Sequence, residues 1–377
     1  MLRNLKVATT KLRTKQSQNT MLTKNKYKEF DWVLLGVGVA IFIAGLLLLF
    51  SATYTRNADF LARQAAWFLT GGLLFIVIIN INYRKIVSLG YVFYFLALIS
   101  LLIVLFFGSK RLGAQRWLDL GFFNLQPSEF AKLFITLALI QYLTEHKAEK
   151  GIKSIASAFL FISIPFVLIL AQPDLGTALM LVPVFFVLLY IWGAKIKHLF
   201  FIIGAGILLS PLGWFLLKDY QKERLAVFIN PDIDPLGAGY TVIQSKIAIG
   251  SGGVFGKGWM SGTQNQLNFL TERHTDFIFS VAGEEWGFAG GVTLIVLYYI
   301  LVRRAFEIAK KTDDPCGVLA ACGMATMIGI QVLVNISMTM GFMPVVGLPL
   351  PLVSYGGSSL LVTMAALGIL ESIALHR

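Results

Sequence analysis

The chain has 377 residues, of which 56% are apolar and 14% charged, with a net charge of +12 and a mean hydropathy of +0.74. Soluble domains carry about 25% charged residues, so this composition excludes an ordinary soluble enzyme and indicates an integral membrane protein. The positive charge is spread over several loops and forms no basic stripe. That distribution suits anionic lipid head groups and argues against nucleic acid as a partner.

Residues 1–30 are rich in Lys and Arg and contain no apolar segment. A cleavable signal peptide needs such a segment, so this region is predicted to be a basic cytoplasmic tail. A charge run of this kind is usually solvated, and we expect the tail to be disordered and to act in setting membrane orientation.

Ten apolar runs follow the tail, each near the length of about 20 residues that crosses a bilayer as a helix. The alternation typical of a membrane barrel is absent, and lipid offers no partner for exposed backbone groups, so helices are required. The sequence predicts an all-α integral membrane protein with about ten transmembrane helices, forming one polytopic domain over residues 31–377. The runs cover residues 31–51, 65–81, 87–107, 128–143, 155–171, 177–192, 199–217, 277–302, 318–340 and 352–375.

The distribution of Lys and Arg predicts the orientation, because cytoplasmic loops retain these residues. With the N-terminus inside, the inner segments hold most of them, which places both termini in the cytoplasm. The two long outer loops are then residues 108–127 and 218–275. The second, between helices 7 and 8, is far longer than the roughly 15 residues of an ordinary connection. Its hydrophobic content and turn signals predict a folded outer cap, with residues 239–251 as an interfacial amphipathic helix.

Cysteine and histidine usage gives no sign of a metal centre. Cys316 and Cys322 are the two cysteines, and the four histidines are scattered along the chain. This pattern predicts neither a disulfide framework nor a zinc site.

Polar residues concentrate at the outer ends of the predicted helices. Glu129 and Lys132 are three apart on the opening turn of the fourth helix, where a simple ion pair is an equally good interpretation. Asp174 follows the fifth helix, where capping of the next helix is the alternative to a binding role. Asn335, inside the ninth run, is expected to hydrogen-bond a neighbouring helix. The remaining candidates in this outer set are Arg111, Gln115, Arg116, Trp117 and Arg273.

The last outer segment reads "MGFMPVVGLPLPLVSYGGSS". Its prolines exclude regular helix and its glycines permit tight turns. Irregular backbone at membrane depth is tolerated only where it is buried in protein or lines a wet cavity. Ser354, Ser358 and Ser359, with the neighbouring Gly-Gly amides, are candidates for binding an anion at a helix start.

Asp276 occupies the point where the eighth helix is expected to enter the bilayer. An ionisable group there is a functional candidate, and a carboxylate suits the role of general base. The alternative is an N-cap for the helix. His274 is interpreted as a loop residue. Glu284, eight residues after Asp276, is interpreted as a packing or hydrogen-bonding group because it lies about 12 Å deeper along a helix.

Five motifs in order resemble the SEDS family (shape, elongation, division and sporulation). They are "GAQRWLDLG" with "QPSEFAK", then "AQPDLGTALM", "NPDIDPLGAGY" with "QSKIAIGSGG", "ERHTDFIFSVAGEE", and "NISMTMGFMPVVGLPLPLVSYGGSS". The match covers the chain from about residue 31 to its end. The last motif looks more like the elongation members than the division members.

The resemblance implies a peptidoglycan glycosyltransferase that polymerises lipid II at the outer face of the bacterial cytoplasmic membrane during cell elongation, releasing undecaprenyl pyrophosphate. It implies Asp276 as the catalytic base and the other outer residues as substrate-binding groups, with Arg111, Arg116, Lys132 and Arg273 as cations for the phosphates. A divalent cation, Mg or Mn, is an expected helper for the leaving pyrophosphate, and no organic cofactor is expected. The implied partners are a class B penicillin-binding protein transpeptidase and the elongation machinery.

Two other functions fit the same helices. A flippase would move lipid II across the membrane, and a scaffold would hold a cell-wall transpeptidase without catalysis. A flippase needs polar residues along the whole path, whereas the charged residues here gather at the outer face. This asymmetry favours chemistry at the outer surface.

Overall fold

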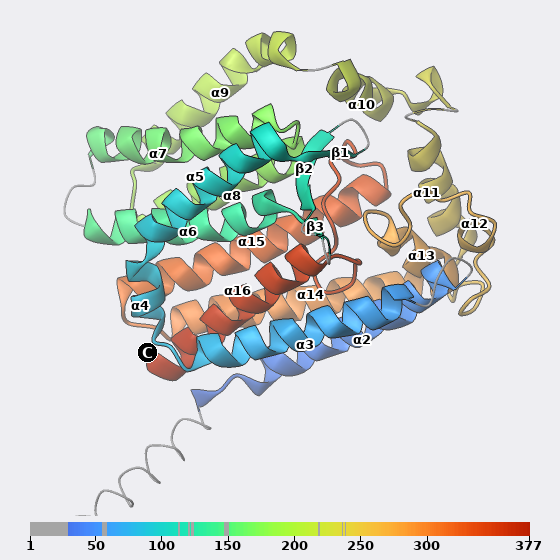
Figure 1. Cartoon of the computed structure of the whole chain (residues 1–377), viewed down its shortest axis with the longest axis horizontal. Coiled ribbons are helices and arrows are strands. Elements are labelled where there is room, and N and C mark those ends of the chain that lie inside the picture. Colours follow the sequence, from blue (N-terminus) through green and yellow to red (C-terminus); the bar gives the residue numbers. More distant parts are fainter. Residues whose placement is uncertain are drawn as a thin grey trace, which may run out of the picture.

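The computed structural model of the chain describes residues 29–54, 59–111, 114–119, 121, 124–146, 151–217, 219–235, 237 and 239–377. Side chains are not described for residues 110, 111, 114, 115, 212, 213, 216 and 220. The predicted tail therefore lies outside the described residues except for its last two positions. Within the described part, long helices dominate (Figure 1), which confirms the predicted fold class.

The long helices correspond to the ten predicted runs. In the described ranges, seven of them are long and apolar enough to cross a membrane by length and composition. The helices are α2 (Trp32–Thr53), α3 (Asp59–Ile79), α5 (Gly90–Phe107), α6 (Pro127–Glu145), α7 (Ile152–Ala171), α8 (Leu175–Trp192), α9 (Ile196–Leu216), α13 (Ile278–Glu285), α14 (Gly287–Lys310), α15 (Pro315–Thr339) and α16 (Gly357–His376). The protein is a multi-pass membrane protein.

Shorter elements complete the chain. They are α4 (Tyr83–Ser88), β1 (Ser109–Arg111), β2 (Ala114–Asp119), β3 (Asn124–Leu125), α10 (Asp219–Ile229), the 3₁₀ helix η1 (Pro231–Ile233), α11 (Tyr240–Ser251) and α12 (Thr263–Gln266). The three strands form a small antiparallel sheet in the order β1-β2-β3, which the sequence did not predict. The sheet and α10 to α13 lie at one end of the bundle, whereas α4 and the C-terminus lie at the other (Figure 1).

The eighth predicted run is two helices. Its backbone breaks between α13 and α14 at Gly287, which has φ +66°. A Cβ on this residue would lie 2.2 Å from the Gly256 amide nitrogen, so only glycine fits. The amides of Phe288 and Ala289 instead donate to the Gly253 and Val254 carbonyls of the outer cap. The break therefore joins the cap to the helix bundle.

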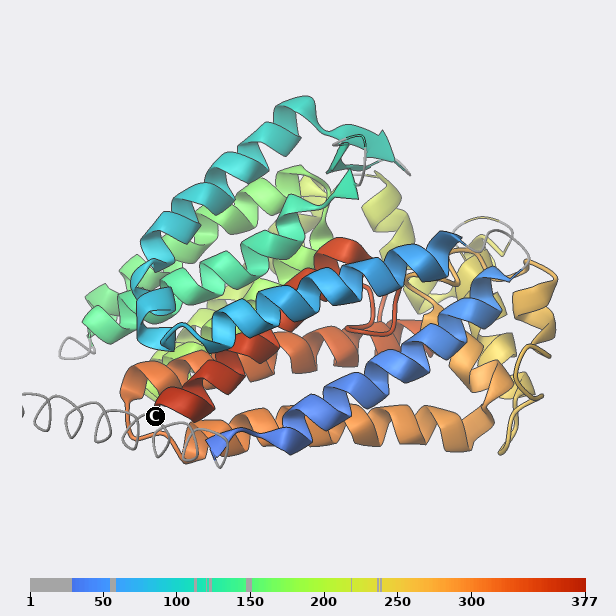
Figure 2. The ribbon, with the colours of Figure 1, turned by 60° about the horizontal axis from the view of Figure 1, so that its bottom comes forward.

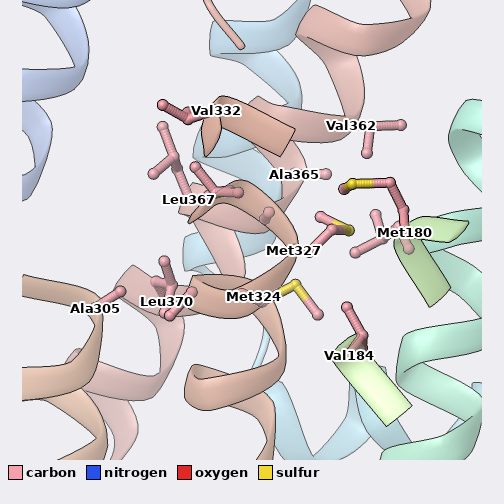
Figure 3. Close-up of a cluster of buried hydrophobic side chains, with 14 of the residues drawn as sticks. Met180, Val184, Ala305, Met324, Met327, Val332, Val362, Ala365, Leu367 and Leu370 are labelled. Atoms are coloured by element: carbon pink, nitrogen blue, oxygen red, sulfur yellow. The ribbon is translucent and has the colours of Figure 1, made fainter. Parts of the chain in front are cut away.

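The core lies where the C-terminal helices pack against their neighbours. Figure 3 shows Met324 and Met327 of α15 between side chains of α8 and α16, including Met180, Val184, Leu367 and Leu370. In Figure 2, α3 lies across α16 and α2 runs beside α14. Because lipid is as apolar as the helix surfaces, association of these helices depends on close packing.

The segment between α15 and α16 is irregular, as its prolines predicted, and enters the bundle from the cap end. Leu348, Leu350 and Val353 are each about 99% buried. A Cβ on Gly45 of α2 would lie 2.6 Å from the Val353 Cα, and one on Gly176 of α8 would lie 2.6 Å from the Val346 carbonyl oxygen. These contacts hold the segment between two helices. They confirm that its irregular backbone is buried in protein. Helix α16 consequently begins at Gly357, later than the predicted residue 352.

Candidate functional site

Asp276 lies in the turn that precedes α13, and three successive backbone carbonyls of this turn are anchored. The N-cap of α13 is Phe277, with no side-chain capping bond, so the capping interpretation of Asp276 is wrong. The anchoring bonds are Tyr355 N to His274 O at 2.9 Å, Ser354 Oγ to Thr275 O at 2.6 Å, and Asn335 Nδ2 to Asp276 O at 2.9 Å. The main chain that carries the carboxylate is therefore fixed on one side.

Two of the anchoring residues were predicted to have other partners. Ser354 also accepts a hydrogen bond from the Leu350 amide at 2.7 Å, so its hydroxyl links the turn before α13 to the irregular segment between α15 and α16. It does not face either of the cavities described below. Asn335 also donates to the Leu348 carbonyl at 2.7 Å, so it bonds two loop segments and no neighbouring helix. Both side chains support the site through the main chain.

The Asp276 carboxylate borders two cavities. The cap-side cavity, of about 230 Å³, lies under α10 and α11 and is lined by Val227, Phe228 and Lys246 among others. The sheet-side cavity, of about 190 Å³, lies beside β2 and the start of α16 and is lined by Trp117, Tyr355 and Ser358 among others. The residues common to both cavities are Arg224, Glu272 and Asp276. Asp276 therefore lies at the junction of the two cavities.

The environment of Asp276 makes its carboxylate basic. The pKa of the Asp276 carboxyl is raised to about 6, chiefly by burial and next by the nearby negative charge of Glu272, while Arg224 and Arg116 act in the opposite direction. Among the described residues, no side chain donates a hydrogen bond to this carboxylate or forms an ion pair with it. A general base performs best when its pKa is near the working pH, and this carboxylate meets that condition.

The Glu272→Gln substitution tests this electrostatic coupling. Removing a neighbouring negative charge lowers the pKa of a carboxyl group. The acidic limb of the kcat/KM profile, expected near pH 6 in the wild type, should therefore move to lower pH. A pH series of initial rates checks this, with Asp232→Asn as the control because Asp232 is exposed and lines neither cavity. If the acidic limb of the Glu272→Gln variant lies at the same pH as in the wild type or at a higher pH, the electrostatic coupling is contradicted.

The predicted residues Arg116 and Trp117 lie at the sheet-side cavity. The Arg116 guanidinium donates to the Pro173 carbonyl and lies 3.8 Å from an Asp174 carboxylate oxygen. Asp174 is buried, caps α8 through the Thr177 amide, and accepts a hydrogen bond from Ser128 at 2.8 Å. The capping interpretation of Asp174 thus holds, and its further effect is to orient Arg116 toward the site.

Glu129 and Lys132 form a buried ion pair at 2.8 Å, with each side chain at most 2% exposed. Neither lines the two cavities, so the predicted contact of these residues with substrate is not what the geometry shows. Lys132 also donates to Gln331 Oε1 at 2.9 Å. The Gln331 amide nitrogen in turn donates to the Pro349 carbonyl at 2.8 Å and lies 3.4 Å from the Ser359 hydroxyl. The Glu129–Lys132 pair therefore supports the wall of the sheet-side cavity indirectly, through Gln331.

Arg273 is turned away from both cavities, in contrast to its predicted role as a phosphate cation. The residue is 2% exposed, and its guanidinium donates to the Ala52 carbonyl at 2.7 Å and the Asn265 carbonyl at 2.5 Å. Glu284 is buried, as expected of a hydrogen-bonding group, and accepts from the amides of Gln264 and Asn265. Both residues fix the cap to the bundle.

Ser358 and Ser359 line the sheet-side cavity, together with Gly356 and Gly357. The Ser358 hydroxyl accepts a hydrogen bond from the Gln126 amide at 3.1 Å. The side chains of Arg111 and Gln115 lie outside the described residues, although their backbones belong to β1 and β2. Their predicted contacts with substrate stay predictions.

Three bordering residues were not singled out by sequence reasoning. Arg224 on α10 donates to the Val345 carbonyl at 3.1 Å and borders both cavities, Glu272 borders both, and Lys246 on α11 borders the cap-side cavity. All three belong to the long outer loop, whose turns and helices gave no sign of which side chains face inward. Glu272 carries one signal that the structure alone reveals, a positive φ of +48°, which is strained for a residue with a side chain.

The described residues contain no group of three or more His, Cys, Asp or Glu side chains placed to hold a metal ion. The carboxylates of Glu272 and Asp276 are what the two cavities offer to a cation. Mg²⁺ is often bound by one or two carboxylates together with substrate phosphates. The site thus fits a cation that arrives with a phosphorylated substrate and does not fit one held by protein alone.

Comparison with known proteins identifies the family. Residues 30–377 match the family described as cell cycle protein, FtsW/RodA/SpoVE. The peptidoglycan glycosyltransferase MrdB of Escherichia coli is 39% identical over 368 residues, which cover 94% of this chain and 98% of that protein.

Two solved structures share the fold. One describes the structural coordination of polymerization and crosslinking by a peptidoglycan synthase complex, with a TM-score of 0.79, 38% identity, and coverage of 92% of this chain and 97% of that one. The other is the rod shape determining protein RodA of Thermus thermophilus, with a TM-score of 0.70, 33% identity, and coverage of 92% and 96%. The chain belongs to the FtsW/RodA/SpoVE family, which is the SEDS family that its motifs predicted.

Proposed function

We propose that this protein is a peptidoglycan glycosyltransferase that polymerises lipid II during cell elongation and releases undecaprenyl pyrophosphate. The observation that carries the proposal is the Asp276 carboxylate, with a pKa raised to about 6, at the junction of two cavities. Two cavities suit a reaction that joins two large molecules. The names of the relatives, including MrdB, support the same activity.

In the proposed reaction, the 4-hydroxyl oxygen of the acceptor sugar attacks the anomeric carbon of the donor. A new carbon–oxygen bond forms while the bond from that carbon to the pyrophosphate breaks, and the hydroxyl proton passes to Asp276. Pyrophosphate leaves with the bonding electrons. Because it is already a good leaving group, cations are sufficient to stabilise its developing charge. Arg116 and Arg224 are near enough to affect Asp276 electrostatically.

The decisive experiment is incubation of the purified protein with labelled lipid II, followed by separation of the products on a gel. A glycosyltransferase produces a ladder of glycan strands. A flippase or a non-catalytic scaffold leaves lipid II unchanged. A flippase requires a continuous polar path across the membrane, whereas the region among α8, α15 and α16 holds the apolar cluster of Figure 3. This supports the enzyme over the flippase.

We propose the cytoplasmic membrane as its location, with both termini in the cytoplasm. The support is the distribution of Lys and Arg together with the placement of the cap elements opposite α4 and the C-terminus (Figure 1). Single cysteines introduced at Gln264 and at Lys310, with Cys316 and Cys322 replaced, report the orientation. An impermeant thiol reagent should label position 264 in intact cells, and labelling of position 310 would reverse the assignment.

A class B penicillin-binding protein is the partner we propose, with the elongation machinery around it, because a similar solved structure concerns a complex that couples polymerization to crosslinking. Purification from native membranes in mild detergent should retain this transpeptidase.

We also propose that Mg or Mn takes part, held by the substrate pyrophosphate and the Glu272 carboxylate, where it would neutralise charge on the leaving group. Chelation of divalent ions should then reduce polymer yield, and undiminished yield counts against the ion.

A further inference from the structure

The two cavities that meet at Asp276 have walls of different chemistry. The cap-side cavity combines apolar side chains, among them Val227, Phe228 and Met343, with the cations Arg224 and Lys246. The sheet-side cavity has Trp117 and Tyr355 with the hydroxyls of Ser358 and Ser359. Resting on the function proposed above, we propose that the cap-side cavity binds the prenyl pyrophosphate end of the donor and the sheet-side cavity binds the acceptor saccharide.

Lys246 is the first support for the donor assignment. It projects from α11, and no described residue forms a hydrogen bond or an ion pair with it. Its stem lies over Gly341, where a Cβ would approach the Lys246 Cε to 2.1 Å, and Gly341 has φ +75°. Glycine at this position therefore leaves room for the lysine stem along the cavity wall. An ammonium without a protein partner is well suited to a phosphate.

Arg224 on α10 provides the second cation of the cap-side cavity. Its guanidinium is held by the Val345 carbonyl and it borders Asp276. The planar guanidinium presents several donors in a fork that matches phosphate oxygens. The carboxylates of Glu272 and Asp276 lie on the edge that the two cavities share, whereas Lys246 lies on the wall of the cap-side cavity alone. Pyrophosphate bound between the two cations leaves the anomeric carbon at the Asp276 edge.

The apolar side chains next to the cap-side cavity suit the prenyl chain that continues from the pyrophosphate. Phe228 and Met343 line the cavity and are 37% and 36% exposed. Ile229 and Ile233, at the end of α10 and in η1, are 83% and 64% exposed. Exposed apolar side chains that continue from a cavity wall mark a site for an apolar ligand or a membrane. They offer a prenyl chain a route toward the lipid.

The sheet-side cavity has the groups that recognise a sugar. Aromatic side chains supply flat apolar surfaces, and a small number of well-placed polar groups orient a ligand. Trp117 and Tyr355 are the aromatic residues, and Gln126, Ser358 and Ser359 are the polar ones. The acceptor hydroxyl would approach Asp276 from this side, and the pyrophosphate would depart on the other.

The test measures equilibrium binding of farnesyl pyrophosphate, a soluble prenyl pyrophosphate, to the detergent-purified full chain. Lys246→Gln and Arg224→Gln should each raise the Kd about 10-fold to 100-fold, the range expected when one hydrogen bond to a charged group is lost. Lys222→Gln is the matched control, because Lys222 is on α10 as well but lines neither cavity. Its Kd should equal that of the wild type.

The sheet-side variants Tyr355→Ala and Ser358→Ala complete the design. They should bind farnesyl pyrophosphate normally but raise the KM for an acceptor glycan when lipid II blocked at its 4-hydroxyl serves as the donor. Wild-type affinity in both cation variants, loss of pyrophosphate binding in the sheet-side variants, or no saturable binding to the wild type overturns the assignment. Failure of the wild type to polymerise lipid II, by contrast, removes the proposed function, because the binding measurement does not depend on turnover. Melting temperatures of all variants establish that they fold.

Discussion

Asp276→Asn is expected to lower the rate of lipid II polymerisation about 10²-fold to 10⁴-fold, the usual contribution of a general acid or base. Asparagine has nearly the same size and hydrogen-bonding shape but does not accept the acceptor's proton. Asp276→Glu should also be severely impaired, since displacements of about 1 Å reduce proximity effects strongly. The measurement is polymer yield against time for detergent-purified protein.

Stability separates this result from misfolding. The Asp276 side chain caps no helix, because the N-cap of α13 is Phe277, and the turn is anchored through backbone carbonyls that the substitution leaves in place. The melting temperature of Asp276→Asn should therefore stay near that of the wild type. Asp232→Asn, in the exposed part of the cap, serves as the control. If Asp276→Asn retains more than about a tenth of the wild-type rate, the general-base role is excluded, because the loss is below what even a weak base contributes.

Lys132→Ala is expected to destabilise the protein by about 3–5 kcal/mol, the cost of leaving one member of a buried ion pair without its partner. Glu129 is 1% exposed and its second carboxylate oxygen has no hydrogen-bond partner among the described residues. Removing the lysine therefore leaves a buried charge without compensation. Thermal unfolding in detergent should show a clearly lower melting temperature.

The double variant Glu129→Leu with Lys132→Met is the matched test. Replacing a buried pair by apolar residues of similar volume is often neutral or stabilising, so the melting temperature should recover. Activity should stay at least about tenfold lower, because Lys132 fixes the orientation of the Gln331 amide and a 1 Å displacement near a site is costly. Full activity in the stable double variant would show that the Glu129–Lys132 pair contributes to folding stability but not to activity. A double variant no more stable than Lys132→Ala would contradict the ion-pair explanation.

The sequence by itself determined the membrane class and nearly all the long helices. Lipid leaves a spanning segment no choice but to satisfy its own backbone, so an apolar run of sufficient length predicts a helix without any knowledge of its neighbours. A local rule also held at a single residue. Asp174 caps α8, which depends on the few residues around it.

Elements that depend on distant contacts were predicted less well. The eighth run is broken because the cap packs against Gly287, and the small sheet in residues 109–125 forms by pairing across a short loop. Neither pairing has a signature in the apolar pattern. The position of Asp276 just before the start of a helix was predictable from the sequence, but the residues that surround it in space were not.

The tertiary structure alone decided which charged residues surround Asp276. Arg273 is three positions away in the chain, yet its guanidinium is buried against the Ala52 and Asn265 carbonyls. Arg224 and Lys246 come from helices of the cap, far earlier in the chain, and line the cavity beside Asp276. Side-chain direction follows from the backbone turn and from the carbonyls that other segments offer as partners. A sequence shows that a cationic residue is present. Only the packed fold determines whether its side chain lines a cavity or is buried in hydrogen bonds to backbone carbonyls.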